Sequence, residues 1–227
     1  MPKISVIIPV YNAQDTIEDC LNSIFSQTFK DLEVIAVNDG STDLSWTILE
    51  KWQDRVKIFS QKNMGAPVAR NFGFAQSQGD YVIFCDSDVV MKPVLLEKMH
   101  QTLEKNKDKA YAYSSFKFGW KTFKIWPYDL NKLKLGPYIP TTSLIRRNYF
   151  PGFDESLKKF QDWDLWLTIS EKGGEGIWLS EVLFCAKTGG TMSRWLPKFF
   201  YKLSWLKFVK KYNQAKTIIQ KKHNLKP

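Results

Sequence analysis

Short apolar runs alternate with helical patterns over the first hundred residues. Runs rich in β-branched and aromatic residues predict strands at 4–10, 32–38, 56–60 and 81–86. Apolar residues spaced three or four apart predict helices over 13–26, 44–53 and 67–77. Pro93 predicts the first position of one more helix. This alternation is typical of the α/β class: a Rossmann-like, mostly parallel sheet with helices on both faces.

Polar clusters follow three of the predicted strands. Pro9 to Asn12 follow the first strand, residues 38–43 follow the second, and Asp86-Ser87-Asp88 follow the fourth. In open parallel sheets, ligands bind at the carboxyl ends of the strands. We therefore expect one binding rim to which all three clusters contribute.

The Asp86 and Asp88 carboxylates stand two residues apart at the tip of a predicted buried strand. Two carboxylates so close repel unless a cation balances them. Mg²⁺ or Mn²⁺ supplies that charge, and typically takes one or two protein carboxylates plus substrate phosphates. The alternative is an Asx-type turn with both groups in solvent.

The segment 38–43 (NDGSTD) reads as a turn followed by a helix start. Ser41 or Thr42 would cap the helix, with Asp43 in its first turn. Asp39 is then free to accept from a base or ribose, as acidic residues do in dinucleotide folds. By itself, Arg70 on the third predicted helix reads as a surface charge, and both histidines, His100 and His223, also read as surface residues.

Beyond residue 108 the periodicity weakens. Residues 110–118 alternate like a half-exposed strand, and 119–138 show no clear period. A helical pattern follows near 162–171 and an apolar run at 177–185. Aromatic residues in this part would suit stacking on sugar rings, although most aromatic side chains belong to the core by default; the candidates are Trp120, Trp126 and Tyr128.

Four segments in register resemble the inverting family 2 glycosyltransferases of the GT-A fold. They are IPVYN, VNDGSTD, NMGAPVARNFGFAQSQGDYVIFCDSD and GFDESLKKFQDWDLW, and the likeness runs over roughly residues 3–193. The resemblance implies a nucleotide-diphosphate-sugar donor, most often a UDP-sugar, and an enzyme of polysaccharide or lipopolysaccharide biosynthesis in the bacterial cell envelope. It also implies that Pro9, Tyr11, Asp39 and Arg70 bind the nucleotide, while the Asp86-Ser87-Asp88 (DXD) motif contacts ribose and the metal–diphosphate.

The same resemblance implies a general base. An inverting transfer needs a base for the acceptor hydroxyl, and the family places it in an acidic pair at the start of a late helix. Asp162 occupies that position, and Gln161 stands where the other acid is usual. Without the resemblance, Asp162 reads as a helix N-cap or first-turn acid. Asp164, two residues on, is assigned to structure.

Two positions depart from the family pattern. Val89 stands where a further Asp often follows the motif, and Thr188 stands where a histidine is expected. The second departure puts metal affinity in doubt more than the reaction class, and the protein either manages without that histidine or uses Lys187 or Arg194. Residues 136–147 (GPYIPTTSLIRR) resemble the segment that leads to the acceptor site.

From the resemblance as a whole we expect a GT-A domain over 1–193, with a nucleotide-binding half at 1–108 and an acceptor half at 109–193.

The charge of the chain is concentrated at its end. The net charge is +10, from 33 basic and 23 acidic residues. Residues 194–227 hold ten Lys or Arg and no acid, so the remaining 23 basic residues balance all 23 acids of the body. A neutral body lacks the basic groove of a nucleic-acid binder, so we expect no nucleic-acid partner.

The tail 194–227 is also aromatic. A helix begun near Pro197 would carry one apolar stripe that packs on the domain and a second stripe, edged with lysines, that suits an anionic membrane surface; the stripes are Phe199, Phe200, Leu203 and Leu206, and Tyr201, Trp205, Phe208 and Tyr212. The alternative is an ordinary packing helix with a solvated basic end.

Apolar content of 44% indicates a globular protein. The three cysteines (Cys20, Cys85 and Cys185) fall within apolar patterns and read as buried, reduced thiols. No signal peptide or spanning segment is visible, so we expect a cytoplasmic enzyme, peripheral on the inner face of the membrane, that acts on a glycan or lipid-linked acceptor. The alternatives are a sugar-phosphate nucleotidyltransferase, whose glycine- and arginine-rich loop is missing after the first strand, and a non-catalytic membrane- or nucleic-acid-binding protein that uses the tail.

Overall fold

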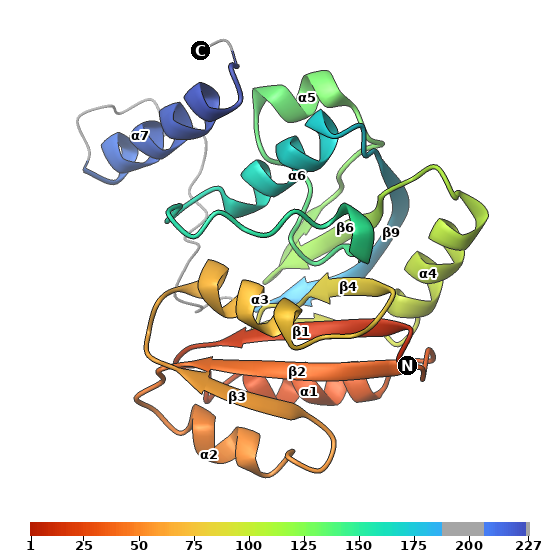
Figure 1. The fold of residues 1–227 in the computed structure, drawn as a ribbon, viewed down its shortest axis with the longest axis vertical. Helices are drawn as coiled ribbons and strands as arrows, with labels where there is room; N and C mark the ends of the chain where they lie inside the picture. Colours follow the sequence, from red (N-terminus) through yellow and green to blue (C-terminus); the bar gives the residue numbers. More distant parts are fainter. Residues whose placement is uncertain (188–206, 226–227) are drawn as a thin grey trace.

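One mixed sheet organises the chain in this computed structural model (Figure 1). The structure describes residues 1–187 and 207–225. In that part of the chain the strands are β1 Ile4–Val10, β2 Leu32–Asp39, β3 Lys57–Gln61, β4 Tyr81–Phe84, β5 Val89–Met91, β6 Tyr111–Phe118, β7 Lys121–Phe123, β8 Leu144–Arg146 and β9 Gly176–Ala186. Their order is β3-β2-β1-β4-β8-β6-β9-β5, with β7 paired to β6.

Helices connect most of these strands. They are α1 Ile17–Phe25, α2 Ser45–Glu50, α3 Ala66–Ala75, α4 Leu95–Lys105, α5 Leu130–Leu135, α6 Gln161–Glu171 and α7 Lys207–Lys222, with a 3₁₀ turn at Arg147–Tyr149. Among the described residues, no helix is both long enough and apolar enough to cross a bilayer.

The sheet is mostly parallel, as the alternating pattern predicts. Strands β3, β2, β1 and β4 pair in parallel, and β6 pairs in parallel with β9. Strand β8 runs antiparallel to both β4 and β6, and β5 runs antiparallel to β9. Strand β7 also runs antiparallel to β6. Strands β5, β7 and β8 have only three residues each, too few to produce a recognisable period in the sequence.

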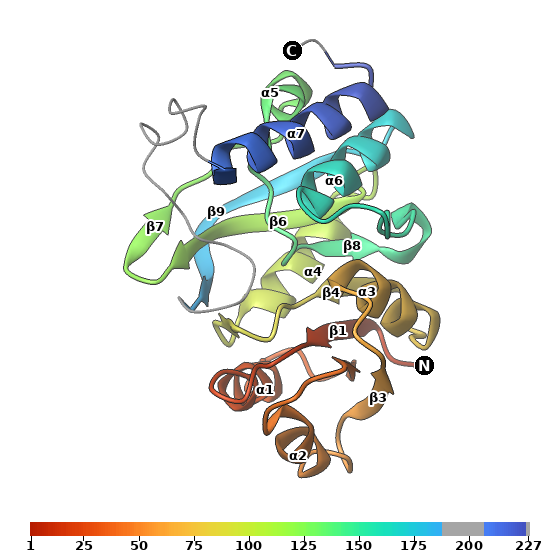
Figure 2. The same ribbon diagram turned by 90° about the vertical axis from the view of Figure 1, so that its left-hand side faces the viewer.

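Alternate residues of β1 point into two different cores. Val6 and Ile8 lie with Leu21 of α1 and Leu96 of α4 on one face. Ile7 lies on the other face with residues of α6, among them Trp166. Both faces of the sheet are therefore covered by helices, as a buried parallel sheet requires and as Figures 1 and 2 show.

The predicted boundaries need several corrections. Helix α1 begins at Ile17, later than the expected start near residue 13. Pro93 does not open α4, because that helix begins at Leu95. Helix α7 begins at Lys207, and the residues assigned to the tail stripes before it lie outside the described part of the chain.

Both histidines are packed and not free on the surface. His100 is partly buried between the rings of Phe29 and Tyr81, which lowers its pKa by desolvation. His223 is buried between two acids of α6. Cys20 and Cys85 are buried free thiols, as expected, whereas Cys185 is only partly buried.

Candidate functional site

The carboxyl ends of three adjacent strands form the predicted rim. Strands β2, β1 and β4 lie side by side and parallel, so their carboxyl ends share one edge of the sheet. Pro9 is buried within β1, and Tyr11 just beyond it is 38% exposed. Asp39 ends β2, and Asp86 follows β4. The structure therefore brings together the clusters that the sequence pattern placed at this edge.

The loops after β1 and β2 are joined by side-chain hydrogen bonds. The Asn12 Oδ1 atom accepts from the Thr42 amide at 2.8 Å, and the Asn12 amide donates to Ser41 Oγ at 3.1 Å. Asp43 accepts from the amide of Ser45, the first residue of α2, at 3.0 Å. The predicted capping role of Ser41 or Thr42 is therefore wrong: both bind Asn12, and Asp43 precedes the helix.

Asp39 is buried and already has three donors. One carboxylate oxygen accepts from Gln61 Nε2 and from the Met64 amide, each at 2.8 Å. The other accepts from the Gly65 amide at 2.8 Å. Asp39 thus holds the loop that leads from β3 into α3, and any contact with a nucleotide would be shared with that task.

Arg70 is buried at the centre of the rim, contrary to its reading as a surface charge. Its side chain is 2% exposed. One guanidinium nitrogen donates to Asp86 Oδ1 at 2.5 Å, and the other donates to Gln161 Oε1 at 2.9 Å. Arg70 therefore links the end of β4 to the first residue of α6. The Nε atom has no partner in the described residues.

The Asp86–Asp88 segment forms a backbone turn with unlike carboxylates. The Val89 amide donates to the Asp86 carbonyl at 3.0 Å, which closes the turn between β4 and β5. The Asp86 side chain is 37% exposed and paired with Arg70. Burial, followed by the charge of Asp86, raises the pKa of Asp88 to about 6. A turn is therefore present, as the alternative interpretation expected. Its carboxylates, however, are not both free in solvent as that interpretation required.

The carboxylate pair fits a hard divalent cation. A partly desolvated Asp88 beside a second carboxylate gains from a nearby positive charge, and carboxylate oxygens are the ligands that Mg²⁺ and Mn²⁺ prefer. Within the described ranges, no group of three or more His, Cys, Asp or Glu residues is placed to hold a metal. A cation on Asp86 and Asp88 would therefore need further oxygen ligands from a phosphate or water.

Asp162 lies next to this network, in the first turn of α6. Helix α6 begins at Gln161, and the Asp162 carboxylate accepts from the Trp163 amide at 2.9 Å. Desolvation raises the pKa of Asp162, and the positive charge of Arg70 partly opposes that rise. The residue before the helix, Phe160, has φ +60, an uncommon conformation for a side chain of this size.

Helix α7 packs on α6 from outside. The ring of Tyr212 meets that of Phe160 edge-on, with centroids 5.0 Å apart. His223 Nε2 lies 2.8 Å from Asp164, and Lys222 lies at the same distance from that carboxylate. The assignment of Asp164 to structure agrees with these contacts. Tyr212, placed by sequence on a membrane-facing stripe, faces the domain.

The candidate acceptor aromatics have different environments. Trp120 is 90% exposed on the β6–β7 turn. Trp126 is partly exposed and stacks on Tyr138. The Tyr128 hydroxyl is within hydrogen-bond distance of Ser170 Oγ, at 3.1 Å, so this residue contributes to packing.

Of the residues considered as substitutes for the expected histidine, only Lys187 is described. Its amide donates to the Asp88 carbonyl at 2.9 Å, and its ammonium group pairs with Asp19. Thr188 and Arg194 lie outside the described residues.

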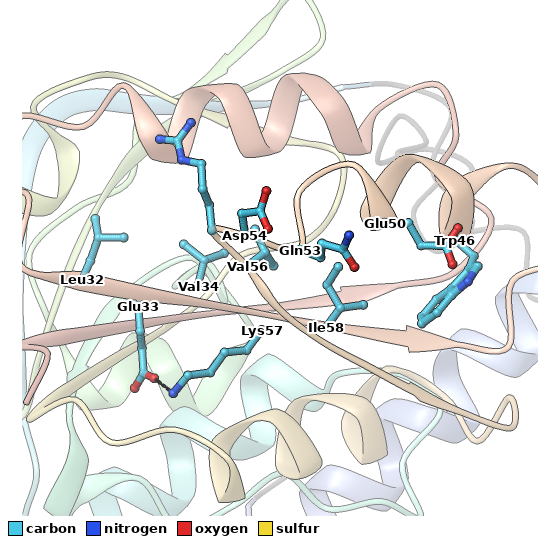
Figure 3. Close-up of a pocket in the computed structure, with 11 residues that line it drawn as sticks. Leu32, Glu33, Val34, Trp46, Glu50, Gln53, Asp54, Val56, Lys57 and Ile58 are labelled. Atoms are coloured by element: carbon cyan, nitrogen blue, oxygen red, sulfur yellow. Dashed lines mark hydrogen bonds and ion pairs between the residues drawn. The ribbon is translucent and has the colours of Figure 1, made fainter.

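A hollow of about 630 Å³ lies elsewhere, at the amino ends of β2 and β3 (Figure 3). Leu32, Val34 and Ile58 line it from the strands, and Trp46 lines it from α2. Because it opens at the opposite end of β2 from Asp39, it does not belong to the rim.

A family model identifies this architecture. The model described as Glycosyl transferase family 2 matches residues 5–163, which include the rim and the start of α6. The chain belongs to this family. The expected resemblance is therefore confirmed.

Curated relatives carry related names. A glycosyltransferase of Haemophilus influenzae without an established function is 33% identical over 76% of this chain and 61% of its own length. Glycosyltransferase GlyA of Streptococcus pneumoniae is 39% identical over 44% of this chain and 15% of its own. A cholesterol galactosyltransferase of Borreliella burgdorferi is 41% identical over 43% and 28%, respectively. The chain thus spans less than two thirds of each of these relatives.

Solved structures share the fold. The 1–349 fragment of Staphylococcus aureus TarS, in complex with UDP-GlcNAc, superposes with a TM-score of 0.73 at 23% identity, over 88% of this chain and 64% of that one. The mannosyltransferase PcManGT of Pyrobaculum calidifontis, with GDP-Man and Mn²⁺, gives a TM-score of 0.65 at 20% identity, over 87% and 58%. The predicted GT-A fold is confirmed by this likeness.

Proposed function

We propose that this protein transfers a sugar from a nucleotide-diphosphate sugar, with a UDP-sugar as the expected donor, to a hydroxyl of a glycan or lipid-linked acceptor, with inversion at the anomeric carbon. The observation that carries the proposal is the buried Arg70, which joins the Asp86 turn to the helix of Asp162. A donor-binding rim and a candidate base are thereby held in one connected network. The names of the family members agree with this reaction class.

The rim residues would divide the work of holding the donor. Tyr11 offers an exposed ring beside the buried Pro9, and Asp39 fixes the loop 61–65 at the rim. Asp86, Ser87 and Asp88 lie on the turn after β4, where ribose and diphosphate oxygens would meet them. Arg70 supplies the positive charge behind this turn.

A divalent cation, Mn²⁺ or Mg²⁺, on Asp86 and Asp88 would neutralise the diphosphate leaving group. The Mn²⁺ complex of a structural neighbour supports this assignment. The chain's own contribution is to keep the two carboxylates together and to bury Asp88 in part. The ion pair between Arg70 and Asp86 reduces the repulsion between the Asp86 and Asp88 carboxylates.

Asp162 would take the proton of the attacking hydroxyl. Its raised pKa makes it a stronger base than an exposed aspartate. Its start-of-helix position holds the carboxylate still, since the Trp163 amide donates to it. Gln161 is neutral, so it does not compete with Asp86 and Asp162 for the positive charge of Arg70.

We further propose a cell-envelope polysaccharide or lipopolysaccharide setting, on the cytoplasmic face of the membrane. Support comes from the outward face of α7, where Lys210, Lys211 and Lys221 are exposed. The positive charges of these lysines would attract an anionic membrane surface. The name of the cholesterol galactosyltransferase shows that a lipid acceptor occurs among the relatives.

The test is the Asp162→Asn variant. It keeps the size of the side chain and its place in α6 but removes the base. We expect transfer to fall by a factor of roughly 10²–10⁴, while the dissociation constant of the donor changes less than about threefold. Asp80→Asn, at an exposed aspartate remote from the rim, is the matched control.

Transfer measured with a radiolabelled donor and donor binding measured by calorimetry separate the two effects. Retention of full activity in Asp162→Asn would reject the base assignment. Joint loss of activity and donor affinity would instead make Asp162 a binding residue. The family match leaves the nucleotidyltransferase alternative without support.

A further inference from the structure

The β6–β7 hairpin, residues 116–123 and hereafter the Trp120 hairpin, holds a large ring out in solvent. Gly119 and Trp120 form the two-residue turn between the paired Phe118 and Lys121. Gly119 has φ +55, a conformation that suits glycine at the first position of such a turn. Trp120 sits at the tip, 90% exposed.

The base of the hairpin is well packed. The ring of Phe116 is stacked between those of Phe123 and Phe184, with centroid distances of 5.1 and 5.2 Å. The Gly119 amide donates to the Ala186 carbonyl at 2.9 Å. The exposed tryptophan is therefore carried on an ordered support, and its exposure does not result from a lack of structure around it.

The charged residues of the hairpin segment itself are all basic. Residues 116–128 contain Lys117, Lys121 and Lys124 and no acid. Lys117 and Lys124 are exposed. A tryptophan ring prefers the boundary between apolar chains and water, and lysines beside it are attracted to anionic headgroups. This combination is complementary to an anionic lipid surface.

Strand pairing places the hairpin near the predicted rim. Phe118 pairs with Ala186 at the end of β9, and Ala186 also pairs with Val89, the residue after Asp88. The hairpin thus stands near the Asp86–Asp88 turn, at the side of the molecule (Figure 2).

We propose that the Trp120 hairpin docks on an anionic lipid bilayer, with the ring of Trp120 inserted among the headgroups. This surface is separate from the tail, and the proposal does not depend on any catalytic assignment. One consequence does rest on the proposed function: a docked hairpin would hold the donor rim near the bilayer, where a lipid-linked hydroxyl is presented.

The test uses the full chain with vesicles of phosphatidylcholine, alone or mixed with phosphatidylglycerol, in a sedimentation assay. We expect binding only to the anionic vesicles. Trp120→Ala should weaken partitioning by roughly tenfold, as the loss of a partly buried large apolar side chain predicts. Lys117→Gln and Lys124→Gln should each weaken it by about fivefold, the equivalent of about 1 kcal/mol per lysine.

Trp126→Ala is the matched control, because Trp126 is also partly exposed but stacks on Tyr138 and lies under Lys132. We expect it to partition like the wild type. Thermal unfolding should show Trp120→Ala to be as stable as the wild type, since its ring is almost wholly in solvent. Asp162→Asn should bind the anionic vesicles like the wild type, which separates this proposal from the catalytic one.

A second measurement reports on the tip itself. In a Cys185→Ser background, an environment-sensitive dye on the thiol of Trp120→Cys should shift its emission to the blue with anionic vesicles, and a dye on Trp126→Cys should not. An unshifted dye, or wild-type partitioning of Trp120→Ala, would overturn the proposal and leave any vesicle binding to the tail. Binding of an oligonucleotide that depends on Trp120, without vesicle binding, would overturn it as well.

Discussion

At the scale of single residues, the rim contains side chains that stabilise the fold and that we propose also bind the donor. Asp39 shows this most clearly, since its carboxylate accepts three hydrogen bonds from residues 61–65. The loop that it holds leads directly into α3 and therefore to Arg70. Asp39 therefore has a structural role in addition to the nucleotide-binding role that we inferred from its position at a strand end.

We expect Asp39→Asn to destabilise the protein by about 1–3 kcal/mol. The carboxylate accepts hydrogen bonds on both of its oxygens, whereas the asparagine amide has one oxygen that accepts and an NH₂ group that cannot. Donor affinity should fall as well, since the loop before α3 loosens. Urea unfolding and donor titration measure the two effects. The exposed Asp80→Asn is the control, and unchanged stability in Asp39→Asn would show that these hydrogen bonds contribute little.

Arg70 shows what the sequence could not supply. The position of the residue on a helix was predictable, but its burial depends on α6, whose first residue comes 91 positions later. The same holds for His223, whose partners Asp164 and Glu171 lie on another helix. A single sequence shows local periods, and it does not show which distant charges meet.

At the scale of elements, the strands of the first half were predictable and the short elements were not. Strand β1 agrees with its predicted bounds, because a fully buried run of seven residues is a strong signal. Strands β5, β7 and β8 have three residues each, and α5 has six, which is too few for periodicity to be recognised. The polar clusters at strand ends predicted the place of the rim well.

Helix α7 stabilises the helix that carries Asp162. Burial lowers the pKa of His223, but hydrogen bonds with Asp164 and Glu171 outweigh that effect, so the pKa lies above its usual value. Lys222 and Asp154 complete the group of charges at this contact. Protonated His223 therefore joins α7 to α6 more strongly than the neutral ring does.

The pH dependence follows from that shift. A raised folded-state pKa gives stabilisation that is complete below the unfolded value of about 6.5 and is lost as pH rises through the folded value. We expect the stability difference between wild type and His223→Ala to be greatest near pH 5.5 and to shrink toward pH 8.5. Urea unfolding across that range checks this, and a difference that grows with pH would contradict it.

At the scale of the whole molecule, charge is distributed unevenly along the chain. The body has balanced charges and carries the rim, whereas the last 34 residues hold the whole positive excess. The described part of that tail packs on α6 through Tyr212 and His223 and leaves lysines outward. The described part of the tail therefore stabilises α6 and leaves lysines exposed, as the proposed contact with an anionic membrane surface requires.

The central claim, that the rim binds a nucleotide-diphosphate sugar with a metal on Asp86 and Asp88, is tested most directly by thermal unfolding. The protein is heated with UDP, GDP or CDP, each with and without Mn²⁺, alongside an Asp86→Asn/Asp88→Asn double variant. One nucleotide, with UDP expected, should add about 2.7 kcal/mol at a concentration 100-fold above its dissociation constant. The gain should need Mn²⁺ and vanish in the double variant. Stability unaffected by every nucleotide, or an equal gain in the double variant, would contradict the account.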